Sequence, residues 1–392
     1  MVLALSFSCT LHPLIYLVIQ KSLIIFLLAF TTPGSILRPA LFPAVLMGNY
    51  YLLPTYTLRI PRLAWIGFVS GEILTGPLDY LEKLLISQWS FGHYGPSAEI
   101  GSKTRADRQD KPSREHTARS PNSALDKENS GWATTLASSW KRLKFGTWVA
   151  ISNRYIGSPY QARNTPPYST SNPNYVPSRS AYLLRRGTVF LACYLIINVL
   201  LLGNQPALNP IIYAETEVPF FPRLSRHEIT PEEIFTRVST TLGFWIGAYF
   251  TIQGYYSATG FLSVASGLSS QKDRRPTFGS PQDAYSIRRF WGVFWHQLMR
   301  KKFTTIAEYV TFPLLRLFRL PHKPHTILPR YTQLVLAFVI SGLLHQSIEM
   351  AQELRWNESG ALEFYVLMAM GIIAEDVVVW GWGRVVGDRD DE

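Results

Sequence analysis

The sequence predicts an all-α, polytopic membrane protein with about seven to eight transmembrane helices and additional interfacial helices. Hydrophobic residues make up 47% of the 392 residues and aromatic residues 14%, whereas charged residues make up only 17%. Several apolar stretches approach the roughly 20 residues that an α-helix needs to cross the hydrocarbon core of a bilayer. The two cysteines, Cys9 and Cys193, lie in apolar surroundings, so they offer neither a disulfide framework nor a metal site.

Candidate spans follow one another along most of the chain. They are residues 11–30, 36–57, 63–88, 184–203, 238–268, 331–348 and 362–384. The stretch 238–268 has no charged residue and is longer than one crossing, so we expect it to tilt or to break at Gly254 or Gly260. Segment 303–319 is also apolar, but Pro313 and a glutamate in its interior predict an interfacial or re-entrant position rather than a crossing.

The alternation of apolar and polar segments predicts three parts. Residues 1–90 hold N-terminal transmembrane helices, residues 91–131 form a basic insert, and residues 132–392 form the core. Because residues 96–131 contain hardly any large apolar side chain, we expect this part of the insert to be disordered. Residues 140–148 are basic and aromatic, which indicates an amphipathic helix lying in the membrane interface.

The charge distribution predicts an orientation in the membrane. A net charge of +11 is compatible with nucleic-acid binding, but the aromatic residues lie in the spans rather than between basic residues, which argues against it. Segments 91–181 and 269–330 are basic, whereas 204–237 and 349–361 lean acidic. The positive-inside rule therefore places the basic segments in the cytosol, for an integral, multi-pass protein that we expect in the endoplasmic reticulum. The sequon at Asn357 then lies on the lumenal side and predicts a glycoprotein.

His345 is an ionisable residue inside an apolar stretch that runs from Phe338 to Gln346. An imidazole in such a place needs a polar partner or a water-filled cavity, so it is either a hydrogen-bonded core histidine or a functional group. In a helix, Ser341, His345 and Glu349 share one face. Two roles for Glu349 remain open. It either fixes the tautomer of the imidazole, leaving the other nitrogen free as a base, or only marks the lumenal end of the helix.

A second unusual stretch, residues 286–302, concentrates cations and tryptophans. If it is helical, one stripe of the helix holds Arg288, Trp291, Trp295 and Lys302. Cations beside a membrane cavity suit a phosphate-bearing substrate, and aromatic rings suit a nucleobase or an acyl chain. The alternative is an aromatic belt with arginines that extend toward the membrane surface.

Together, these stretches resemble motifs of the membrane-bound O-acyltransferase superfamily, in its wax-synthase-like branch. Those proteins carry a DFWGRRWHQ-like stretch followed, at matching spacing, by F-x-x-SGxxH; here residues 289–297 read RFWGVFWHQ and residues 338–345 read FVISGLLH. Residues 154–166 resemble a further motif, RGIGxxWxVKNxP. Arg289 stands where the family has aspartate, and Val293 and Phe294 stand where it has two arginines, which affects substrate details.

The resemblance implies a bundle around an acyl-transfer tunnel, in which an acyl group passes from a coenzyme A thioester to a hydroxyl without a covalent acyl-enzyme. It implies that His345 is the general base and that His296 hydrogen-bonds the acyl donor or the developing oxyanion. No metal is expected, and acetyl-CoA is a co-substrate rather than a bound cofactor. By their charge alone, the expected contacts for the coenzyme phosphates are Arg288, Arg289, Arg300, Lys301 and Lys302, and Trp291 and Trp295 complete the expected coenzyme site.

The overall resemblance is to fungal enzymes that acetylate terpenoid or meroterpenoid alcohols of secondary metabolism. The expected partners are an acyl-CoA, a lipophilic alcohol and membrane lipids. One alternative is a long-chain wax-ester or diacylglycerol acyltransferase. Another is a transporter with His345, Glu375 and Asp376 as a proton relay, although the chain shows no paired repeats. In the acyltransferase interpretation, Glu375 and Asp376 brace a neighbouring helix instead.

Overall fold

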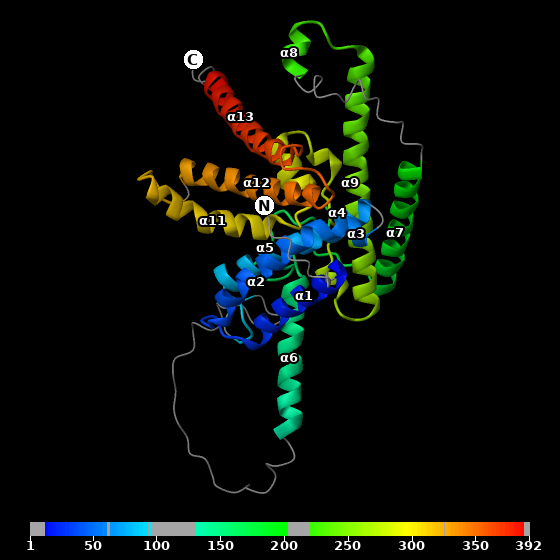
Figure 1. Cartoon of the computed structure of the whole chain (residues 1–392), viewed down its shortest axis with the longest axis vertical. Coiled ribbons are helices and arrows are strands. Elements are labelled where there is room, and N and C mark those ends of the chain that lie inside the picture. Colours follow the sequence, from blue (N-terminus) through cyan, green and yellow to red (C-terminus); the bar gives the residue numbers. More distant parts are fainter. Residues whose placement is uncertain are drawn as a thin grey trace, which may run out of the picture. The chain divides into compact units, whose positions relative to one another are not determined.

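The computed structural model describes residues 12–60, 63–92, 95, 131–202, 220–324 and 326–387. Across these residues the regular structure is helical and contains no β-sheet, which confirms the all-α prediction (Figure 1). The chain forms two compact units, one made of Met1–Asn164 with Ser280–Glu392 and the other of Thr165–Gly279. The part of the insert predicted to be disordered lies outside the described residues, apart from Gly131 at the start of a helix.

The first unit begins with helices that are more broken than the sequence suggested. Two predicted spans, 36–57 and 63–88, are each divided into several pieces. The second of them breaks at Thr75, just before Gly76 and Pro77, because proline has no N–H to continue the hydrogen bonds of the preceding helix. The elements are α1 (Pro13–Phe30), α2 (Leu37–Leu52), η1 (Leu53–Thr55), α3 (Tyr56–Arg59), α4 (Leu63–Leu74), α5 (Gly76–Tyr80) and the π-helix η2 (Leu81–Ile86).

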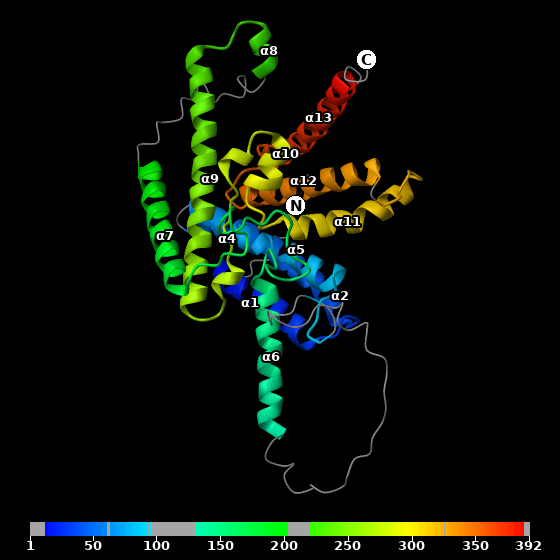
Figure 2. The ribbon, with the colours of Figure 1, turned by 180° about the vertical axis from the view of Figure 1, so that it is seen from behind.

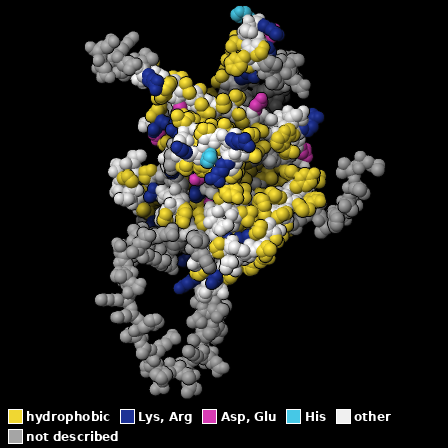
Figure 3. Space-filling view, turned by 90° about the vertical axis from the view of Figure 1, so that its left-hand side faces the viewer, with side chains coloured by type: hydrophobic (Ala, Val, Ile, Leu, Met, Phe, Trp, Pro, Cys, Tyr) yellow, Lys and Arg dark blue, Asp and Glu magenta, His cyan; other side chains and the backbone are white. Residues whose placement is uncertain are grey.

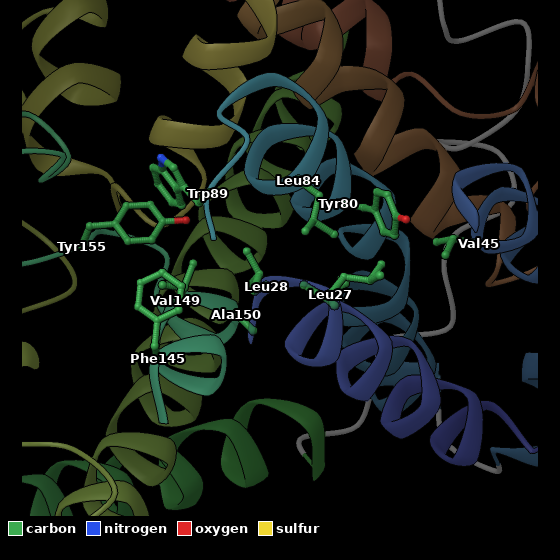
Figure 4. Packing of buried hydrophobic residues seen from close by; sticks show 11 residues of the cluster. Leu27, Leu28, Val45, Tyr80, Leu84, Trp89, Phe145, Val149, Ala150 and Tyr155 are labelled. Carbon is green, nitrogen blue, oxygen red and sulfur yellow. The ribbon is translucent and has the colours of Figure 1, made fainter. Parts of the chain in front are cut away.

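A hydrophobic core joins α1, η2 and α6 (Gly131–Ile151) in this unit (Figure 4). Leu28 and Val149 are fully buried in it, and the rings of Trp89 and Tyr155 meet edge to face with centroids 4.7 Å apart. α6 approaches α1 closely at Gly146, where a Cβ atom would lie 2.6 Å from a backbone carbonyl oxygen of α1. The helix predicted over 140–148 therefore buries one face against the N-terminal helices.

Asp79 of α5 is the centre of a buried ionic cluster. Its Oδ1 lies 2.9 Å from Nζ of Lys83 and 2.8 Å from Nζ of Lys302 on α11 (Arg300–Leu317), and its Oδ2 lies 3.3 Å from Nζ of Lys21 on α1. Lys83 also donates to the carbonyl oxygen of Ala150 at 3.0 Å. Because a buried charge is tolerated only when it is paired, this cluster fixes helices from distant parts of the sequence against one another.

The C-terminal part of the first unit contains α11, α12 (Ile327–Met350) and α13 (Ala361–Gly387). α11 and α12 lie side by side in both views (Figures 1 and 2), and α12 also packs on α13. Pro313 does not interrupt α11, which runs continuously as an amphipathic helix. α12 and α13 touch at Gly342, where a Cβ atom would lie 2.8 Å from the Cα of Leu362.

The second unit is built on two long helices that pack along each other, α7 (Arg179–Leu202) and α9 (Pro231–Ala265), with the short α8 (Phe220–Ser225). Of the tilt or break expected for residues 238–268, the break does not occur, since α9 is continuous through Gly254 and Gly260. These glycines instead face α7: a Cβ atom at Gly254 would lie 3.1 Å from that of Cys193, and one at Gly260 would lie 2.5 Å from Oη of Tyr182. The close packing of α7 therefore explains why both positions are occupied by glycine.

Surface composition and helix length both indicate a membrane protein. Among the described residues, three helical segments are long and apolar enough to cross a bilayer: Pro13–Phe30, Arg179–Val199 and Ile327–Met350. Large apolar side chains are exposed on α1, α7, α9 and α13, and hydrophobic groups cover much of the face in Figure 3. A bilayer accommodates such a surface, which water would not.

Candidate active site

The imidazole of His345 is held at both ring nitrogens. Its Nδ1 lies 2.8 Å from the carbonyl oxygen of Ser341, one turn earlier in α12, and its Nε2 lies 3.1 Å from the hydroxyl oxygen of Tyr365 in α13. A carbonyl oxygen can only accept, so Nδ1 carries the proton and the lone pair of Nε2 accepts from the Tyr365 hydroxyl. The neutral ring therefore has its basic nitrogen at Nε2.

Glu349 does not fix this tautomer. Its Oε2 accepts a hydrogen bond from Oγ of Ser359, at 2.5 Å, in the segment between α12 and α13. The tautomer role considered for Glu349 is wrong, because the carbonyl of Ser341 already binds Nδ1 of His345. Glu349 instead links the end of α12 to the turn that leads into α13.

Trp291 packs against the aromatic side chains around His345. Its ring centroid lies 5.8 Å from that of Phe338, 5.5 Å from Tyr365 and 6.3 Å from Phe364. Phe338 and His345 belong to one sequence motif and Trp291 to the other. The structure thus brings the two motifs into contact through an aromatic cluster.

Residues 286–302 do not form the single helix considered above. A short helix, α10 (Ile287–Arg289), is followed by the π-turn η7 (Phe290–Phe294), and Trp295 is extended with φ −65° and ψ 151°. The side-chain amide of Gln297 holds this irregular backbone by donating to the carbonyl oxygens of Trp291 and Trp295. The predicted stripe is therefore wrong. Trp295 is buried and stacks on Phe290, and Lys302 is buried against Asp79.

His296 lies in this irregular segment and is partly buried. Burial lowers the pKa of its imidazole to about 3, with smaller contributions from charges at His345 and Arg154. His296 is therefore neutral near pH 7 and can donate a hydrogen bond without carrying a positive charge. The contribution of His345 to this shift indicates that the two histidines singled out from the sequence lie near each other.

The third motif, residues 154–166, reaches the same site. Nδ2 of Asn164 donates to the carbonyl oxygen of Gly292 at 2.7 Å, and Arg154 is buried close enough to influence the charge of His296. The hydroxyl of Tyr155 donates to Glu82 at 3.2 Å. The segment therefore connects the irregular backbone around His296 to the N-terminal helices.

Glu375 and Asp376 of α13 hold the start of the first motif. The carboxylate of Glu375 accepts from the backbone N–H groups of Ile287 and Arg288, at 2.6 and 2.9 Å, and so caps α10. Asp376 accepts from Nε of Arg288 at 2.8 Å and from the hydroxyl of Tyr331 at 2.6 Å. These contacts confirm the expectation that the two carboxylates brace a neighbouring helix, and they argue against a proton relay with His345.

The other two arginines expected to contact a coenzyme also have protein partners. The guanidinium of Arg289 pairs with Asp283 and lies 4.7 Å above the ring of Tyr285. Nη1 of Arg300 donates to the carbonyl oxygen of Gly292 at 2.7 Å. A bound phosphate must therefore share these cations with their present partners or displace those partners.

Comparisons with known proteins agree with these motifs. Residues 274–367, which contain both histidines, match the membrane bound O-acyl transferase family. Acetyltransferase fsoF of Humicola fuscoatra is 33% identical over 313 residues, covering 79% of this chain and 70% of the relative. Acetyltransferase aurG of Calcarisporium arbuscula is 30% identical over 360 residues, covering 91% and 80%. Acetyltransferase atnC of Arthrinium sp is 33% identical over 247 residues, covering 62% and 54%. No solved structure matches the chain.

Proposed function

Because this chain belongs to the membrane bound O-acyl transferase family, we propose that His345 is the general base of an acetyl transfer from acetyl-CoA to an alcohol. The protein is an acyltransferase that acetylates a secondary metabolite. The hydrogen bond at Nδ1 of the imidazole is the observation that supports His345 as the base. The Ser341 carbonyl holds the proton on Nδ1, so Nε2 is the nitrogen that accepts a proton.

The proposed reaction needs no covalent intermediate on the enzyme. The alcohol oxygen attacks the thioester carbonyl carbon while its proton moves to His345, and a tetrahedral oxyanion forms. The neutral imidazole of His296 supports this step by donating a hydrogen bond to the oxyanion, an interaction that is strong in a site from which water is excluded. When the C–S bond breaks, the coenzyme thiolate takes up the proton from His345.

The aromatic cluster around His345 supports a lipophilic acceptor, and we infer a hydroxylated terpenoid or meroterpenoid. Trp291, Phe338 and Phe364 group beside the base, and such an aromatic group suits a rigid apolar skeleton. For the donor, we infer that Arg288, Arg289 and Arg300 contact the coenzyme phosphates and that Trp291 and Trp295 contact its apolar parts. A long-chain wax-ester or diacylglycerol acyltransferase is the alternative, and donor chain length distinguishes the two.

For the membrane arrangement we infer about seven to eight transmembrane helices; segments of α1, α7 and α12 that are long and apolar enough to cross a bilayer support this arrangement. The proposed compartment is the endoplasmic reticulum, with the His296 segment near the cytosolic face, where acetyl-CoA is supplied. The acceptor then enters from the membrane, in which a lipophilic alcohol dissolves.

The function is tested with microsomes that contain the protein. Radiolabelled acetyl-CoA with a panel of hydroxylated terpenoids is compared with radiolabelled palmitoyl-CoA and fatty alcohols, and empty microsomes serve as the control. Label in a terpenoid acetate supports the proposal. Label only in wax esters or neutral lipids contradicts the acetyl donor and favours the long-chain alternative.

A substitution at His296 tests its role as a hydrogen-bond donor. We expect His296→Asn to retain part of the activity, because an amide also donates, and His296→Ala to lose about 2–4 kcal/mol of transition-state stabilisation. Both variants are compared with wild type in kcat and kcat/KM. Equal activity in all three proteins means that His296 has no part in the chemistry.

The orientation is tested at Lys272, an exposed residue in the 3-10 turn η5 (Gln271–Asp273). With residues 269–330 in the cytosol, Lys272→Cys is expected to react with a membrane-impermeant thiol reagent in intact, right-side-out microsomes. Wild-type protein measures the background from Cys9 and Cys193. Labelling of Lys272→Cys that requires detergent overturns the orientation.

A further inference from the structure

We propose that Tyr365 is a second catalytic residue, whose hydroxyl passes the proton of the acceptor alcohol to His345. This inference rests on the proposed role of His345 as the base. The basic nitrogen of His345 already has a hydrogen-bond partner, since Nε2 lies 3.1 Å from Oη of Tyr365. A ring nitrogen has one lone pair, so the acceptor alcohol cannot donate to Nε2 while the tyrosine does.

Either the alcohol displaces the tyrosine hydroxyl, or it donates to that hydroxyl. The packing of Tyr365 favours the second possibility. Its side chain is only 9% exposed, and its ring centroid lies 4.7 Å from that of His345, 5.5 Å from Trp291 and 6.4 Å from Phe338. A ring enclosed in this way cannot swing aside without repacking its neighbours. Its phenolic oxygen, in contrast, can accept from the alcohol where it stands, because it has two lone pairs and the Ser341 side chain, which interacts with this hydroxyl, uses at most one of them.

The helix packing maintains this contact. Gly342 leaves room for the backbone of α13, because a Cβ atom there would lie 2.8 Å from Cα and 3.3 Å from the carbonyl oxygen of Leu362. Gly342 and Leu362 lie about one helical turn before His345 and Tyr365 in their respective helices. The serine and glycine of the motif thus have separate roles. The backbone carbonyl of Ser341 holds Nδ1 of His345 and its side chain interacts with the Tyr365 hydroxyl, whereas Gly342 lets α13 come close enough for Tyr365 to reach Nε2.

The proton transfers balance through this arrangement. The acceptor O–H donates to Oη of Tyr365, and Oη–H donates to Nε2 of His345. As the acceptor oxygen bonds to the thioester carbon, its proton moves to Oη and the phenolic proton moves to Nε2, so the tyrosine stays neutral. Cleavage of the C–S bond releases the coenzyme thiolate, which recovers the proton by the reverse path. The products are an ester and a thiol, and no other reactant is consumed.

The first test removes the hydroxyl and keeps the ring. Tyr365→Phe is compared with Tyr80→Phe, which removes a buried hydroxyl bonded to the carbonyl oxygen of Arg38 in the same unit. The acceptor is the terpenoid alcohol that wild type acetylates fastest. We expect kcat of Tyr365→Phe to fall about 10²–10⁴-fold, the usual range for a lost proton-transfer group. We expect an acceptor KM close to that of wild type, and near-normal kcat in Tyr80→Phe.

Other kinetic outcomes overturn the proposal. Wild-type kcat in Tyr365→Phe shows that the hydroxyl is not on the proton path. A higher kcat or a lower acceptor KM shows that the alcohol normally has to displace the tyrosine. Loss of activity in His345→Ala but not in Tyr365→Phe overturns the relay alone, whereas an active His345→Ala overturns the proposed base itself.

The second test does not depend on the acceptor. Diethyl pyrocarbonate modifies an imidazole at a nitrogen with an available lone pair, and mass spectrometry of the peptide that contains residue 345 gives the rate. We expect the rate at His345 to rise in Tyr365→Phe, because Nε2 loses its donor, and to stay at the wild-type value in Tyr80→Phe. Equal rates in wild type and Tyr365→Phe overturn the hydrogen bond on which the inference depends.

Discussion

His345→Ala is expected to abolish acetyl transfer while the protein stays in membranes at a near-normal amount. The side chain makes two neutral hydrogen bonds, to the Ser341 carbonyl and the Tyr365 hydroxyl, and such bonds contribute about 0.5–1.5 kcal/mol each to stability. Removal of the base, in contrast, leaves the alcohol without an acceptor for its proton as it attacks the thioester. The loss is therefore chemical rather than structural.

The measurement is radiolabelled acetyl transfer at saturating donor, normalised to the amount of membrane-inserted enzyme. His322→Ala is the matched control, because His322 is exposed in the loop before α12 and its ring bonds to a nearby backbone carbonyl, that of Leu320. We expect His322→Ala to retain wild-type activity. Activity of His345→Ala within a few-fold of wild type removes this residue from the mechanism.

Much of this site is predictable from the sequence, because its key residues are polar groups in apolar surroundings. His345 stands out in an apolar helix, and the motif around His296 stands out by its density of tryptophan and arginine. Tyr365 gives no such signal, since a tyrosine in an apolar span is most simply a packing residue. Only the approach of α13 at Gly342 brings its hydroxyl to His345.

The wrong predictions have a common origin. They follow from the spacing of residues along the chain, whereas contacts between distant residues determine the conformation at these positions. Glu349 has the helical spacing to reach His345, but a backbone carbonyl one turn earlier is nearer to Nδ1. Residues 286–302 have a helical pattern, but contacts from Glu375 and Asn164 hold them in a short helix and a π-turn. Gly254 lowers the helix propensity of α9, yet the packing of α7 on this glycine keeps the helix continuous.

The ionic cluster around Asp79 was also outside the reach of sequence patterns, because its members come from segments far apart in the chain. Lys21 is in α1, Lys83 is in η2 and Lys302 is in α11, a few residues after His296. A carboxylate within a predicted span has to be paired, but spacing along the chain does not identify its partner. The cluster links the segment that carries His296 to the N-terminal helices. These helices lie outside residues 274–367, the range that matches the family.

Asp79→Leu is therefore expected to destabilise the first unit strongly. The substitution leaves Lys83 and Lys302, both nearly inaccessible to solvent, without their shared carboxylate. Breaking a buried pair by removing one partner typically costs about 3–5 kcal/mol, because the remaining charge is buried and uncompensated. Thermal unfolding of the detergent-solubilised protein measures the effect as a lowered midpoint and a lower yield of monodisperse protein.

Two further variants separate the loss of the pair from general damage. Asp283→Asn breaks the half-exposed pair with Arg289 and is expected to cost about 0–1 kcal/mol. The quadruple variant Asp79→Leu, Glu82→Gln, Lys83→Met and Lys302→Met removes the buried charges together, including that of Glu82, which interacts with both lysines. We expect it to recover most of the stability, while Lys21 keeps Glu72 as a partner 3.8 Å away. Wild-type stability of Asp79→Leu, or no recovery in the quadruple variant, contradicts the role of the cluster. Recovery of stability without recovery of kcat indicates that the contact of Lys302 with Asp79 also positions His296, because α11 begins shortly after this histidine.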